Sequence, residues 1–191
     1  MIIHSKIYPS LVNGPGKRFV LWTQGCKKAC KGCFNPDTWS KNGKEIDIQD
    51  LFLEVKKLDC DGVTITGGDP LEQADEMLEF LKKLNVLDLK KGVILYTGFT
   101  IEEIKYLGGD ILDCLNYVDL LIDGRYVEKL YENNGMKGSK NQRYHFLTNK
   151  LNEKDLSIEH EIEIGFNDEL YLTGFPHLNG KILKKFGIIM K

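Results

Sequence analysis

Short apolar runs alternate with amphipathic segments along the first two thirds of this chain. The apolar runs lie at residues 19–23, 62–66, 93–96 and 118–122, and a glycine follows each of them within two residues. The intervening segments at 46–58, 75–84, 101–107 and 111–115 carry apolar residues at helical spacing. Buried strands that alternate with helices are typical of a parallel sheet covered by helices. The alternation therefore predicts an α/β fold.

The predicted strands all end in small or polar residues. These ends read TQGC at 23–26, TGGDP at 66–70, YTGF at 96–99 and DGR at 123–125. The C-terminal ends of parallel strands are where α/β barrels and open α/β sheets carry their functional sites. About four to six strand–helix units fit into the chain, which is too few for a complete eight-stranded barrel.

The last third of the sequence has a different character. Residues 131–143 are polar and contain glycine, which predicts a loop. Residues 160–165 and 170–173 predict a β-hairpin, and residues 183–191 predict a short closing helix. Because the sequence shows no internal repeat and no long linker, we expect one domain over 1–191. Its core should span about 18–150, with a C-terminal extension at about 151–191.

Charge and hydropathy exclude several classes of partner. The 26 basic and 28 acidic residues give a net charge of −2 and are spread along the chain, which argues against binding nucleic acid or an anionic membrane. No apolar segment approaches the roughly 20 residues that a membrane span needs. The N-terminal residues MIIHSKIYPS also lack the apolar run of a signal peptide. We therefore expect a cytoplasmic protein.

Three of the five cysteines are crowded into eight positions. Cys26, Cys30 and Cys33 have the spacing C-x3-C-x2-C, whereas Cys60 and Cys114 stand alone in segments typical of a core. In a reducing compartment such a cluster is typical of metal ligands rather than disulfides. Clustered thiols alone leave zinc and iron–sulfur open. Because no second C-x2-C pair and no nearby histidine is present, the pattern favours an iron–sulfur cluster with one iron left open to a substrate.

A second motif, TGGDP, follows the next predicted strand. Gly67 and Gly68 allow the backbone to approach a ligand closely, Asp69 offers an acceptor for a cation, and Pro70 fixes the turn. Taken alone, this segment would be an ordinary strand-to-helix turn. Together with C-x3-C-x2-C and the aromatic Phe34 after it, however, the motif resembles the GGEP-like signature of radical S-adenosylmethionine (SAM) enzymes.

The resemblance implies cofactors and contacts. The three cysteines would bind a [4Fe–4S] cluster whose fourth iron takes the methionyl amine and carboxylate of SAM. Thr97, at the end of another predicted strand, is a further expected SAM contact. No catalytic side chain beyond the cluster and SAM is expected, since the cofactors carry the chemistry. The implied SAM contacts at the methionyl amine are Gly67, Gly68, Asp69 and Pro70. Asp69 stands where the family motif usually has Glu. The implied contacts near the adenine are Gly32, Cys33 and Phe34.

The resemblance extends along most of the chain. The segments GCKKACKGCFNPDTW, YTGFT, VDLLIDGRYV and GSKNQR, from about residue 19 to residue 143, are similar to those of the activating proteins of anaerobic (class III) ribonucleotide reductase. This similarity implies a partial radical SAM (β/α) barrel, open on one side to a protein substrate. It also implies a glycyl radical on the reductase catalytic subunit and an external one-electron donor of the flavodoxin or ferredoxin type.

Two alternatives to a reductase activase stay open. One is a radical SAM enzyme that acts on another protein or peptide, as an activase of a different glycyl radical enzyme or as a peptide maturase. The other is a zinc-binding interaction module without catalytic activity.

Overall fold

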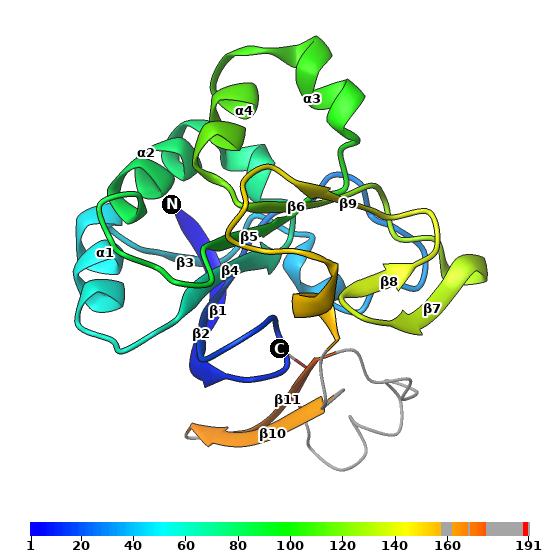
Figure 1. The fold of residues 1–191 in the computed structure, drawn as a ribbon. Helices are drawn as coiled ribbons and strands as arrows, with labels where there is room; N and C mark the ends of the chain where they lie inside the picture. Colours follow the sequence, from blue (N-terminus) through cyan, green and yellow to red (C-terminus); the bar gives the residue numbers. More distant parts are fainter. Residues whose placement is uncertain (158–161, 168, 175–188, 191) are drawn as a thin grey trace.

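A mixed α/β sheet forms the centre of the computed structural model, which describes residues 1–157, 162–167, 169–174 and 189–190. Within these residues seven strands pair in the order β3-β1-β2-β4-β5-β6-β9 (Figure 1). Four neighbouring strands run parallel, as predicted: β2 (Arg18–Thr23), β4 (Gly62–Gly67), β5 (Val93–Tyr96) and β6 (Leu120–Asp123). The predicted α/β class is confirmed.

Antiparallel strands extend this sheet at both edges, and the sequence pattern did not predict them. β1 (Ile2–Ser10) pairs with β2, β3 (Lys44–Glu45) pairs with β1, and β9 (Arg143–Phe146) pairs with β6. In β1 a register shift lies between Ile3 and Ser5, and polar residues separate the buried Ile3 and Ile7. The bulge interrupts the two-residue alternation by which a strand is recognised in a sequence.

Helices cover one face of the sheet, as Figure 1 shows. Their order is α1 (Ile48–Lys56), α2 (Ala74–Leu84), α3 (Ile101–Leu107) and α4 (Gly109–Asp113), close to the predicted segments. The side chain of Asp47 caps α1 by accepting a hydrogen bond from the Asp50 amide at 3.0 Å. Apolar residues of these helices and of one face of the strands form the largest buried cluster. Among the described residues, no helix is both long and apolar enough to cross a lipid bilayer.

The opposite face of the sheet is covered by the last third of the chain. Val20 and Trp22, which alternate along β2 with residues facing the helices, pack against Tyr171 of β11. Further along the sheet, apolar residues of β5 and β6 pack against a group that includes Met136 and Leu156. The face that an incomplete barrel would expose is therefore covered in part by later segments of the same chain.

This last third differs in detail from the predictions. Residues 131–143 are not a plain loop, because β7 (Tyr131–Asn134) and β8 (Lys137–Ser139) pair as a hairpin and Arg143 begins β9. The C-terminal hairpin is confirmed, as β10 (Ile162–Asn167) and β11 (Glu169–Gly174). Of the predicted closing helix, residues 183–188 and 191 lie outside the described residues. The helix is wrong at Ile189–Met190, which form β12 and pair with β11.

A fully buried guanidinium ties three parallel strands together at their N-terminal ends. Arg18 begins β2 and donates from Nε to the Thr64 hydroxyl oxygen at 2.5 Å. Burial lowers the pKa of Arg18 to about 9, so the group remains charged at neutral pH. Its other donors reach the backbone carbonyl oxygens of Pro15, Val63, Lys91 and Gly92.

Replacing this side chain with an apolar one of similar length should destabilise the fold. In Arg18→Met the carbonyl oxygens lose their donors while remaining inside the protein, so we expect the free energy of unfolding to fall by about 3 kcal/mol. Urea denaturation followed by circular dichroism measures this change. Lys17→Met, which removes a neighbouring exposed charge, is the control and should change stability little. A loss below about 1 kcal/mol for Arg18→Met would contradict this account.

Candidate active site

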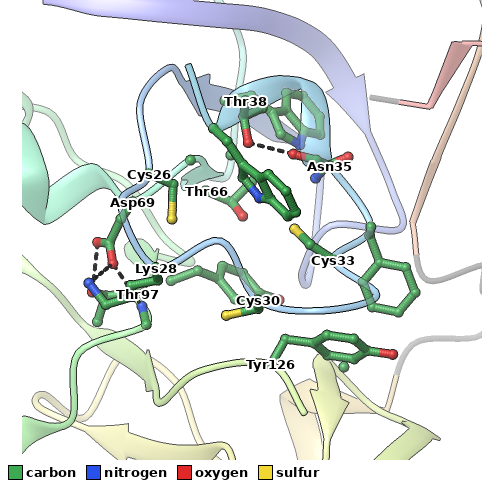
Figure 2. Close-up of a pocket in the computed structure, with 18 of the residues that line it drawn as sticks. Cys26, Lys28, Cys30, Cys33, Asn35, Thr38, Thr66, Asp69, Thr97 and Tyr126 are labelled. Atoms are coloured by element: carbon green, nitrogen blue, oxygen red, sulfur yellow. Dashed lines mark hydrogen bonds and ion pairs between the residues drawn. The ribbon is translucent and has the colours of Figure 1, made fainter. Parts of the chain in front are cut away.

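One cavity lies where the C-terminal ends of the parallel strands meet residues 24–40, here named the cysteine loop. Figure 2 shows Cys26, Cys30 and Cys33 around this cavity, with Asp69 and Thr97 on one side. The lining also includes residues at the ends of β4, β5 and β6, as the sequence predicted for parallel strands. The two sequence motifs therefore face the same space.

Hydrogen bonds at its base close the cysteine loop. The amide of Gly25 donates to the Thr38 carbonyl at 2.8 Å, and the amide of Cys26 donates to the Trp39 carbonyl at 3.0 Å. The side-chain amide of Gln24 donates to two further carbonyls on the returning segment. These contacts fix the first cysteine at the end of β2.

Burial disfavours the thiolate form of two of the three clustered cysteines. Cys26, Cys30 and Cys33 are free and partly buried. Burial raises the pKa of Cys26, against the effect of two backbone amides of the loop. Burial also raises the pKa of Cys33, against the effects of the Asn35 amide and the Trp39 side chain. Donors to sulfur tune bound iron–sulfur clusters, and a metal supplies the positive charge that keeps a buried thiol ionised.

Single-ion sites and iron–sulfur clusters differ in how closely their ligands converge. Within the described part of the chain, no three His, Cys, Asp or Glu side chains converge closely enough to hold one metal ion. A four-iron cluster does not need this convergence, because each thiolate binds a different iron. Cys60 and Cys114 pack with the core as expected, and burial raises the pKa of Cys114 to about 12.

The two glycines of TGGDP make room for the protein's own backbone. Gly67 has a φ of +105°, and a Cβ there would lie 2.5 Å from the Thr23 amide nitrogen. A Cβ on Gly68 would collide with the carbonyl oxygen of Gly25. The amide of Gly68 donates to the Thr23 carbonyl at 2.8 Å, and that of Asp69 donates to the Gly25 carbonyl at 2.9 Å. The two glycines thus bring this turn close to the end of β2 at Thr23 and to the cysteine loop at Gly25.

The carboxylate of Asp69 is buried and has four donors from the chain. Its Oδ1 accepts from the Thr97 hydroxyl at 2.8 Å and the Leu71 amide at 3.2 Å. Its Oδ2 accepts from the Gly98 amide at 3.0 Å and pairs with Lys28 Nζ at 2.7 Å. The sequence predicts that Asp69 accepts a cation, and in this structure the cation beside it is a lysine of the cysteine loop. Sequence reasoning missed Lys28 because nothing local distinguishes it from the neighbouring lysines.

The remaining predicted contacts divide into two groups. Thr97 and Phe34 line the cavity, and the Phe34 ring lies 5.0 Å from that of Tyr126. Gly32 and Pro70 lie outside the cavity lining: Gly32 adopts a φ of +76°, and the buried Pro70 begins a 3-10 helix. Thr97 and Phe34 therefore lie at the cavity, whereas Gly32 and Pro70 lie in turns outside its lining.

The GSKNQR segment makes hydrogen bonds and ion pairs with other parts of the same chain. The side-chain amides of Asn141 and Gln142 donate to backbone carbonyls directly after β6. Arg143 pairs with Asp123 and Glu102, each at 2.6 Å. These contacts fold the β7–β8 hairpin back toward Phe34, whose ring also lies 6.2 Å from that of Tyr131. The segment thus has a structural role beside the cavity.

Comparison with known proteins agrees with this site. A family model described as a 4Fe-4S single cluster domain matches residues 12–145. The anaerobic ribonucleoside-triphosphate reductase-activating protein of Enterobacteria phage T4 is 37% identical over 147 residues, which covers 73% of this chain and 91% of the relative. Proteins of the same name from Vibrio cholerae and Escherichia coli K12 are 30% and 29% identical, over 76% and 75% of this chain and 98% of each relative. This chain therefore belongs to the family of anaerobic ribonucleoside-triphosphate reductase-activating proteins.

Proposed function

We propose that this protein is a radical SAM activase of anaerobic ribonucleoside-triphosphate reductase. It binds a [4Fe–4S] cluster through Cys26, Cys30 and Cys33, cleaves SAM reductively and generates a glycyl radical on the reductase catalytic subunit. The observation that carries the proposal is the set of three thiols on one cavity beside the TGGDP turn. The family model supports the cluster, and the names of the relatives support the reductase as partner.

The side chains at the cavity suit binding, orientation and the exclusion of water. When bound, the reduced cluster and SAM supply a 5′-deoxyadenosyl radical that can abstract hydrogen from a glycine Cα. Gly67, Gly68 and Thr97 lie on the side of the cavity proposed for the methionyl end. Phe34 and Tyr126 provide an aromatic wall suited to an adenine. In this proposal Asp69 and Pro70 complete the TGGDP turn at the methionyl end, and Gly32 and Cys33 lie near the adenine.

Fold, compartment and electron supply complete the proposal. The parallel strands β2, β4, β5 and β6 would form a partial (β/α) barrel of the radical SAM type. Cytoplasm is the proposed compartment, since clustered thiols stay reduced there. A flavodoxin or ferredoxin would supply the single electron.

Activation of the reductase tests the function directly. The purified catalytic subunit is incubated anaerobically with SAM, a one-electron reductant and this protein, and is then examined by electron paramagnetic resonance. We expect a doublet glycyl radical signal on the subunit only when all three are present. If SAM is cleaved but no signal forms, the reductase is not the partner and another protein or peptide substrate is favoured.

A further inference from the structure

Lys28 differs from the other lysines of the cysteine loop. Its side chain is only 7% exposed, whereas that of Lys31 is 92% exposed and Lys27 lies at the surface. Figure 2 shows Lys28 reaching from the loop between the first two cysteines toward Asp69 and Thr97. A lysine ammonium is stable inside a protein only when it is paired. The position of Lys28 therefore depends on partners outside the loop.

Asp69 and Phe99 form a binding site for the ammonium group of Lys28. Nζ lies 2.7 Å from Asp69 Oδ2 and 3.1 Å from the centre of the Phe99 ring, so it combines an ion pair with a cation–π contact. A Cβ on Gly98 would collide with Cδ of Lys28, so the glycine of the YTGF segment leaves space for the lysine stem. The site thus joins the cysteine loop to the ends of β4 and β5.

We infer that Lys28 is a positioning residue that holds the first half of the cysteine loop against these strand ends. This inference rests on the proposed function and deepens it. Because Asp69 is paired with Lys28, its carboxylate holds this part of the loop in place. Lys28 acts on SAM only through the position of Cys26 and Cys30.

A different role for the same contact predicts the opposite result. If Lys28 merely filled a site that the ammonium of SAM takes over, removing it would free Asp69 and strengthen SAM binding. If Lys28 positions the loop, removing it leaves a buried, unpaired carboxylate and a displaced loop, so SAM binding weakens. The sign of the change in SAM affinity therefore separates the two roles.

The test uses Lys28→Met, which keeps the stem and removes the charge. We measure equilibrium binding of SAM to protein that carries the oxidised cluster, so that no turnover occurs. We expect affinity to fall by about tenfold, as when a residue supporting a metal ligand is lost. The electron paramagnetic resonance spectrum of the reduced cluster with SAM should also change. Lys27→Met, which removes an exposed charge from the same loop, should match the wild type in both measurements.

Unchanged or tighter SAM binding in Lys28→Met overturns the inference. If that variant fails to fold or to hold the cluster, Lys28→Met combined with Asp69→Asn removes both charges and avoids the unpaired carboxylate. The double variant should still bind SAM about tenfold more weakly than the wild type, and wild-type affinity in it overturns the inference. A wild-type protein that holds the cluster but does not bind SAM contradicts the proposed function instead.

Discussion

We expect that replacing Cys26, Cys30 or Cys33 individually by alanine abolishes cluster assembly and SAM cleavage while the fold is retained. Each thiol lies on the cavity and each is partly buried. When one of the three proposed protein ligands is removed, a second iron loses its thiolate, so the cluster should no longer be held. Iron and sulfide content after anaerobic reconstitution, with visible absorption, measures the loss. Circular dichroism confirms that each variant is folded.

The other two cysteines provide matched controls. Cys60 and Cys114 pack with the core, and Cys114 is fully buried. Cys60→Ala and Cys114→Ala should therefore keep a full complement of iron and sulfide. Cys114→Ala should cost about 1 kcal/mol of stability through the small cavity it leaves. Loss of the cluster in either control, with the fold intact, would show that the three-ligand assignment is wrong.

The sequence predicts the helices and strands whose apolar residues follow a regular pattern. The parallel strands are rich in apolar residues because both faces are covered, and α1 and α2 each bury one apolar face. β1 and β9 were missed because they are edge or near-edge strands with mixed composition. The β7–β8 hairpin was missed because its residues are mostly polar, although Met136 at its turn packs in the buried cluster with residues of β5 and β6.

The site shows the same distinction between local and tertiary information. The cysteines could be predicted because their spacing reflects the bonding needs of a metal centre. Lys28 could not, because its burial is set by Asp69 and Phe99, which come from other strand ends. Gly68 was identified as a place of close approach, but only the structure shows that Gly25 is the neighbour.

Gly68 provides the second large expected effect. Its φ is not in the left-handed region, so alanine is excluded here by space rather than by backbone conformation. A methyl group would collide with the Gly25 carbonyl oxygen, which accepts a hydrogen bond from the Asp69 amide. Backbone atoms cannot rotate away as a flexible side chain can, so the TGGDP turn and the cysteine loop must separate. We expect Gly68→Ala to lose both cluster retention and SAM binding.

Iron content and equilibrium SAM binding measure these two losses separately. Gly109→Ala is the control, because a Cβ there meets no atom within 4 Å although its φ of +58° is strained for alanine. It should lose about 1–2 kcal/mol of stability from this strain but keep cluster and SAM binding. If Gly109→Ala loses stability but keeps the cluster and SAM binding, then the losses in Gly68→Ala do not come from a general loss of stability. If Gly68→Ala kept its cluster and lost only SAM, the glycine would serve the approach of the cofactor instead. The contact between the two backbones would then not be what requires a glycine at this position.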